Sequence, residues 1–237
     1  MATALTHIGF VNDLKKQNPK FFKNLNLDYV YSGALFPDYY GFYQIQLKKK
    51  YELVPIIKNK NGVLFGKRML KLSKTKEEKS FAIGFITHSI LDEYFHNYFR
   101  KFNASIEEHL ILEFFYDCKF KNLKIPLVKY PSKIIEKTLL KYHKKFDLKK
   151  TDITKIKLLG YYLFLKEIQT QIILKKYVAK KKSYMDIISL FFYRGKFNLK
   201  KLLNPDSQLK NKHLKKLEME YKKALLKNIE ILNTIKI

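Results

Sequence analysis

The chain has 237 residues, 46% of them apolar, and one core accounts for a chain of this length. With only 8 glycines, 6 prolines and a single cysteine, the composition excludes disorder, collagen-like repeats, a β-sandwich rich in glycine and proline, and an internal disulfide. We expect a mainly α protein, a single-domain helical bundle over residues 1–237, whose formal net charge of +27 favours contact with polyanions.

The first predicted element is a short helix over residues 6–17, which ends before Pro19 because proline cannot continue a helix. The following segment, residues 31–42, contains two glycines and a proline. This pattern predicts irregular backbone that turns at Pro37-Asp38.

The next two apolar runs lie on either side of Asn61-Gly62, a dipeptide typical of hairpin turns. They predict a small β-hairpin at about residues 51–70. Pro55 lies within the first run, which can therefore form only an edge strand.

Two apolar helices are predicted next, over residues 81–102 and 105–117. Gly84 in the first indicates close packing against another helix. Ser105 and Glu108 form a capping box that begins the second.

After a predicted loop over residues 119–131, the chain alternates helical patterns with lysine. The last pattern keeps an apolar stripe at helical spacing. Helices are therefore predicted over residues 132–146, 151–178, 183–195 and 213–235.

Histidines and carboxylates repeat at helical spacing in the two apolar helices. His88, Asp92 and His96 follow one another at i, i+4 and i+8, and each step moves only about 40° around the axis. The second helix has His109 and Glu113 at i, i+4. Such spacing is typical of metal ligands, and accidental spacing of surface or core-edge residues is the alternative.

The length of the first helix indicates two ions rather than one. His88 and His96 lie about 12 Å apart along the axis, too far for both to reach one tetrahedral ion. We expect His88 and Asp92 at one ion, His96 with His109 and Glu113 at the other, and Asp92 able to serve either. Such a cluster lowers the pKa of bound water and holds an oxyanion, which suits attack on a phosphoester.

Three further polar residues have simpler interpretations. Asp117, one turn after Glu113, either orients a ligand imidazole or lies on the surface. His143 and His213 have lysine neighbours, which repel a cation, so we expect both to face solvent.

Four segments together resemble the zinc-dependent phospholipase C family, which shares its all-helical fold with the S1/P1-type nucleases. They are THIGF at residues 6–10, SGALFPD ending at Asp38, the helix FAIGFITHSILDEYFHNYF, and HLILE. The resemblance covers roughly residues 6–117. It implies a zinc cluster in which Asp38 both ligates a metal and can act as the general base on the attacking water. The implied ligands are His7, Asp38, His88, Asp92, His96, His109 and Glu113.

The sequence departs from the family pattern in two ways. The pattern expects another histidine before the central helix, yet none occurs from Tyr39 to Thr87. Secreted members also use the mature N-terminal amine and carbonyl as ligands, whereas MATALTHIGF lacks the basic region and apolar run of a secretory signal. We therefore expect a cytoplasmic protein with two or three Zn²⁺ ions, or a weakened site.

The positive charge comes almost entirely from lysine, because Arg68, Arg100 and Arg194 are the three arginines among 48 basic residues. Proteins that recognise bases and phosphates specifically rely on the bidentate guanidinium group. We interpret the lysines as a solvated coat that attracts nucleic acid or anionic membrane without specificity, the alternative being a groove for one polyanion.

The sequence thus predicts a zinc-dependent hydrolase of phosphodiester bonds, in which a metal-bound hydroxide attacks phosphorus. The phosphoester substrate is a phospholipid or a nucleotide. One alternative is a nuclease or nucleotidase on the same scaffold, which would stack bases on aromatic side chains. The other is a non-catalytic basic protein that binds anionic membrane or RNA; the missing histidine favours it, and the retained ligand spacing opposes it.

Overall fold

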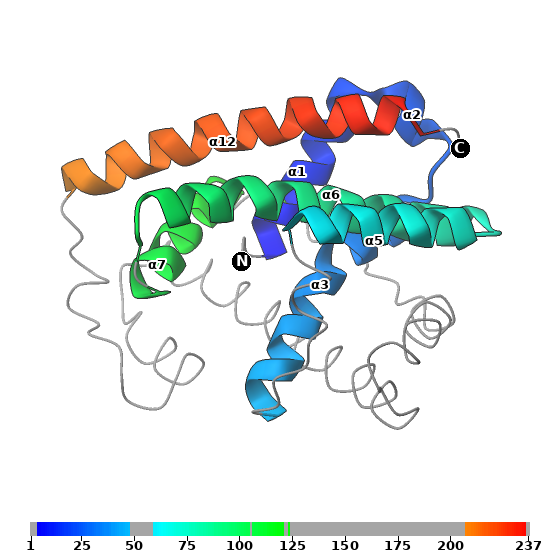
Figure 1. Ribbon diagram of the computed structural model, residues 1–237. Helices are drawn as coiled ribbons and strands as arrows, with labels where there is room; N and C mark the ends of the chain where they lie inside the picture. The colour runs from blue at the N-terminus through cyan, green and yellow to red at the C-terminus, as the bar shows by residue number, and fades with distance from the viewer. Residues whose placement is uncertain (1–3, 48–58, 105, 121–122, 124–206, 236–237) are drawn as a thin grey trace.

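The computed structural model describes residues 4–47, 59–104, 106–120, 123 and 207–235, and every element of regular secondary structure among them is a helix (Figure 1). The predicted mainly α class is therefore confirmed for this part of the chain. The helices predicted within residues 132–195, and His143 with them, lie outside it. In chain order the helices are α1 (Ala4–Gln17), α2 (Pro19–Lys23), α3 (Leu27–Leu47), α5 (Asn59–Leu72), α6 (Lys76–Lys101), α7 (Ile106–Asp117), the 3-10 helix η1 (Cys118–Phe120) and α12 (Ser207–Asn233).

Helix α6 is the central element, because α3, α5 and α12 each pack against it. Figure 1 shows α12 running along one side of α6 and α3 leaving from the other. Every side chain from Ser80 to Asp92 is buried, as expected of a helix surrounded by others. The helix begins earlier than predicted, because Thr75 and Glu78 form a capping box at its N-terminus.

Helices α3 and α6 touch through their backbones at two glycines. A β-carbon at Gly84 would lie 1.9 Å from the carbonyl oxygen of Val30, and one at Gly33 would lie 2.0 Å from that of Phe81. No side chain fits between the helices at these points, so the close packing predicted for Gly84 is confirmed. The crossing lies about one helical turn before Asp38 on α3 and one turn before His88 on α6.

The prediction of irregular backbone at residues 31–42 is wrong, because α3 runs through this segment with Pro37 inside it. A proline in a helix removes one backbone hydrogen bond and disfavours the helix locally. Buried Val30, Ala34 and Phe36 attach this helix to the core, and their packing outweighs that local cost.

The predicted hairpin at residues 51–70 is also wrong over the part that the structure describes, where α5 occupies Asn59–Leu72. Asn61-Gly62 lies in the first turn of this helix rather than in a hairpin turn. Phe65 and Met69 are buried while Leu64 and Lys67 are exposed, a helical rather than an alternating pattern. Residues 51–58 lie outside the described chain.

The predicted helices at residues 6–17, 105–117 and 213–235 are confirmed as α1, α7 and α12. Helix α12 is bound to α1 at distant positions, since the Tyr221 hydroxyl donates to Asp13 Oδ2 at 2.9 Å. Among the helices that the structure describes, none has the length and apolar character needed to cross a bilayer.

Candidate metal centre

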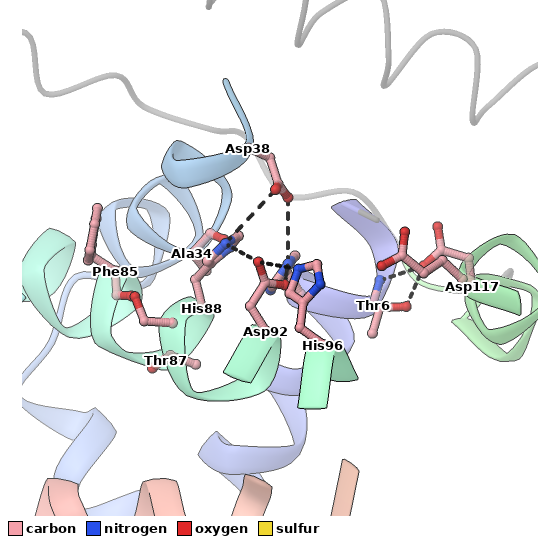
Figure 2. A network of polar contacts seen from close by, with 12 residues as sticks. Thr6, Ala34, Asp38, Phe85, Thr87, His88, Asp92, His96 and Asp117 are labelled. Atoms are coloured by element: carbon pink, nitrogen blue, oxygen red, sulfur yellow. Dashed lines mark hydrogen bonds and ion pairs between the residues drawn. The ribbon is translucent and has the colours of Figure 1, made fainter. Parts of the chain in front are cut away.

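Three helices bring four predicted ligands to one buried point. Helix α6 carries His88 and Asp92, α1 carries His7, and α3 carries Asp38. Figure 2 shows the Asp38 carboxylate pointing towards His88 and Asp92 from the opposite helix. His7, His88 and Asp92 are each 1% exposed and Asp38 is 6% exposed. Bulk water is therefore excluded, and charges interact more strongly than they would in water.

The carboxylate of Asp92 lies between three imidazoles. Its Oδ1 is 3.5 Å from His7 Nε2, and its Oδ2 is 3.2 Å from His88 Nε2 and 3.6 Å from His96 Nε2. Two ligands of a tetrahedral zinc ion lie about 3.4 Å from each other when each is 2.0–2.1 Å from the metal. These separations are therefore those expected between atoms that share a metal.

The Asp38 carboxylate faces the same two imidazoles from the other side. Its Oδ2 is 3.5 Å from His7 Nε2 and its Oδ1 is 3.9 Å from His88 Nε2. The His7 and His88 rings stack, with centroids 3.9 Å apart and an angle of 14° between planes. The Nε2 atoms of both rings thus lie close to Asp38 as well as to Asp92.

Several buried ring nitrogens at this point have no hydrogen bond. They are both nitrogens of His7, Nε2 of His88 and Nε2 of His96. A buried polar atom without a hydrogen bond costs about 1–3 kcal/mol, so a cluster of them requires an explanation. The lone pair of a neutral imidazole is a preferred zinc ligand. The residues present thus fit a zinc ion.

A backbone carbonyl sets the tautomer of His88. His88 Nδ1 lies 2.7 Å from the carbonyl oxygen of Ala34, and because a carbonyl can only accept, Nδ1 carries the proton. The lone pair then resides on Nε2, which faces the two carboxylates. Histidine ligands are commonly oriented in this way. Sequence analysis missed the role of Ala34, because a backbone acceptor leaves no signal in residue type.

The charges around Asp92 favour the protonation states of metal ligands. Burial raises the pKa of the Asp92 carboxyl, but His88, His7 and His96 around it hold that pKa well below its usual range. Burial lowers the pKa of His7, and the charge of His88 lowers it further. Burial also lowers the pKa of His96. At neutral pH Asp92 is anionic and these two histidines are neutral, as zinc binding requires.

The other predicted ligands lie beside this group on α6 and α7. The His96 and His109 rings meet edge to face with centroids 5.1 Å apart. His109 stacks on Phe99 at 3.9 Å, and its Nε2 lies 2.6 Å from Glu113 Oε1. The structure therefore brings His96, His109 and Glu113 into one neighbourhood, with His109 and Glu113 hydrogen-bonded to each other.

Within the described residues, one group has its ligand atoms all within 4.8 Å of one another, and it consists of His7, His88 and Asp92. His96 joins this group through Asp92 Oδ2, which lies near both His88 and His96. Asp92 thus lies close to both of these histidines of α6. Its role as a ligand of one or two ions, and the number of ions, stay predictions.

Of the two alternatives given for Asp117, the surface position is wrong, because Asp117 is only 3% exposed. Its Oδ1 accepts a hydrogen bond from the backbone amide of Thr6 at 2.9 Å and another from the Thr6 hydroxyl. Both of these donors belong to Thr6, the residue before His7.

The prediction that His213 faces solvent is also wrong. His213 is buried, its Nδ1 is hydrogen-bonded to the Tyr98 hydroxyl, and its ring packs on Phe102 at 4.0 Å. The neighbouring Lys212 is exposed, so this lysine and His213 lie on different faces of α12. The contact joins residues far apart in sequence, which local composition cannot indicate.

Comparison with protein families gives one match. The family model described as zinc dependent phospholipase C matches residues 6–166, more than half of the chain. The matched range includes every predicted ligand from His7 to Glu113 and continues past residue 117, where the resemblance noted above ends. Searches of curated proteins and of solved structures found no match.

Proposed function

Because the chain belongs to the zinc-dependent phospholipase C family, we propose that it is a zinc-dependent hydrolase that cleaves the phosphodiester bond of a phospholipid. The observation that carries this proposal is the buried group of His7, His88 and Asp92, whose ligand atoms lie within 4.8 Å of one another. Both ring nitrogens of His7 and Nε2 of His88 have no hydrogen bond, which supports the same assignment. The lysine coat would add non-specific attraction to anionic lipid.

Zinc in such a site supplies a bound water of pKa near 7 and polarises phosphoryl oxygens. The protein's own residues prepare the site for that chemistry. Ala34 holds His88 with its Nε2 lone pair directed inward. Asp92 remains anionic among three imidazoles and so offsets part of a bound cation's charge. Burial of these side chains excludes bulk water and strengthens each of these interactions.

Asp38 is the residue that we propose as general base. A general base must lie within hydrogen-bond reach of the proton that it removes. The Asp38 side chain faces the same imidazoles as Asp92 but is 8% exposed, against 1% for Asp92. Of the two carboxylates, Asp38 is therefore the more accessible to water and substrate. Asp92 is better suited to the role of metal ligand than to that of general base.

Metal content and substrate choice together test this function. We would purify the full chain without chelator, measure zinc by elemental analysis, and follow diacylglycerol release from phosphatidylcholine vesicles. Asp92→Asn should lose zinc and reduce hydrolysis by more than about a hundredfold, which is more than the loss caused by removing a group that only orients a ligand. The matched control is Glu93→Gln, the next carboxylate on α6, which lies outside the ligand group and should behave as wild type.

Three results would contradict the proposal in different ways. Absence of zinc from the wild-type protein removes its basis and favours a non-catalytic protein. Zinc-dependent cleavage of single-stranded nucleic acid without cleavage of phospholipid would favour the nuclease alternative. Equal loss of activity in Asp92→Asn and Glu93→Gln would mean that the zinc assignment is wrong.

A further inference from the structure

The first turn of α1 is held by a side chain from another helix. The amide of Thr6 lies among the N-terminal amides of α1, which have no acceptor within the helix. Asp117, the last residue of α7, accepts this amide at 2.9 Å and also accepts the Thr6 hydroxyl. Both residues are buried, Thr6 being 1% exposed and Asp117 3%. The carboxylate also places negative charge at the positive end of the α1 dipole.

These two hydrogen bonds join helices that carry different predicted ligands. His7 follows Thr6 directly on α1, and Glu113 precedes Asp117 by one turn on α7. Figure 2 shows Thr6 and Asp117 beside the group formed by Asp38, His88 and Asp92. A movement of Asp117 relative to Thr6 would therefore change the distance between His7 and the ligands on α7.

We propose that Asp117 is a positioning residue for the metal centre, which caps α1 from outside and thereby fixes His7 against His88 and Asp92. This inference rests on the proposed function, because it assumes that the His7 group binds zinc. His7 depends on such support more than its partners do. His88 is oriented by the Ala34 carbonyl, whereas both ring nitrogens of His7 are without a hydrogen bond.

The alternative is a purely structural hydrogen bond between helices, and α1 offers a matched example. Asp13, on the same helix, accepts the Tyr221 hydroxyl of α12 at 2.9 Å. It lies nearly two turns beyond His7 and contacts none of the predicted ligands in the hydrogen bonds and ion pairs described. Asp13→Asn and Asp117→Asn therefore make the same chemical change at two carboxylates that connect α1 to its neighbours.

The experiment measures zinc affinity of the full-length variants by competition with a chromophoric chelator. Asp117→Ala should weaken zinc binding by about ten- to a hundredfold, the range found for groups that orient ligands. Asp117→Asn keeps an acceptor and should lose less. Asp13→Asn should lower thermal stability without changing zinc affinity. The visible spectrum of the cobalt-substituted protein should change in the Asp117 variants and stay unchanged in Asp13→Asn.

Amide hydrogen exchange of the metal-free protein gives a readout that needs no zinc. Asp117→Ala should accelerate exchange at Thr6 and His7, and Thr6→Ser, which keeps both donors, should not. The inference is overturned if Asp117→Ala and Asp117→Asn bind zinc as wild type does, or if their losses only match that of Asp13→Asn. Failure of the wild-type chain to bind zinc would overturn the proposed function as well, so the two failures are distinguishable.

Discussion

Replacing Gly84 by alanine is expected to force α3 and α6 apart. The added β-carbon would lie 1.9 Å from the Val30 carbonyl oxygen, and ordinary contact begins at 3.4 Å, so the helices must separate locally by about 1.5 Å. Alanine gains about 1 kcal/mol of helix propensity, and overpacking costs about 1–3 kcal/mol or more. Because the obstacle is backbone, we expect a net loss of about 2 kcal/mol, or about 4–8 °C in Tm for a chain of this size.

The same movement should damage the metal centre. The hydrogen bond from His88 Nδ1 to the Ala34 carbonyl is 2.7 Å long, and the separation just estimated would break it. His88 would then lose the contact that directs Nε2 inward. Gly84→Ala should therefore lower zinc content under mild chelation as well as Tm, measured by elemental analysis and thermal unfolding.

Gly66→Ala is the matched control. Its β-carbon would meet the Ile86 side chain at 2.5 Å rather than backbone, and α5 carries no predicted ligand among its described residues. We expect a smaller loss of Tm and unchanged zinc content. If Gly84→Ala is as stable as wild type and keeps full zinc content, the backbone contact at Gly84 does not set the geometry of the site.

Three other predictions concern the base, the histidines and the charge. Asp38→Asn should abolish hydrolysis with little loss of Tm, and unchanged turnover of a phosphodiester substrate would contradict its assigned role. In the metal-free protein, burial keeps His7 and His96 neutral, while the unfolded chain binds protons below about pH 6.5. Stability should therefore be complete above that pH and fall as the pH is lowered below it, measured by urea titration; an increase on acidification would refute this. Affinity for RNA and for anionic vesicles should fall steeply as salt is raised and should not change when chelator is added. Filter binding and vesicle sedimentation measure the two affinities.

Residue spacing alone could predict two of the four residues in the candidate metal centre. His88 and Asp92 share one helix, and helical geometry places them on one face. His7 and Asp38 come from other helices, and spacing gives no reason to join them. They were predicted through the resemblance, and their positions here depend on the packing of α3 and α1 against α6.

The errors have one physical cause, which is that tertiary packing overrode local turn signals. Asn61-Gly62 favours a turn, but Phe65 and Met69 of α5 are buried, and α5 packs against α6. Their burial contributes about 1.5–3 kcal/mol for each side chain. Pro37 similarly disfavours a helix that the core nevertheless holds. The burial of Asp117 was missed for a related reason, since its partner Thr6 lies 111 positions away.

The position of α12 in the chain has a consequence for biosynthesis. Helix α12 begins at Ser207, 90 residues after α7 ends at Asp117. At about 5–20 residues per second, a ribosome needs about 5–20 s to cover that interval. All the predicted ligands have been translated before α12 is made. During this interval α12 does not yet cover the side of α6 against which it packs. A nascent chain therefore keeps this side of α6 uncovered during that delay and needs protection from aggregation.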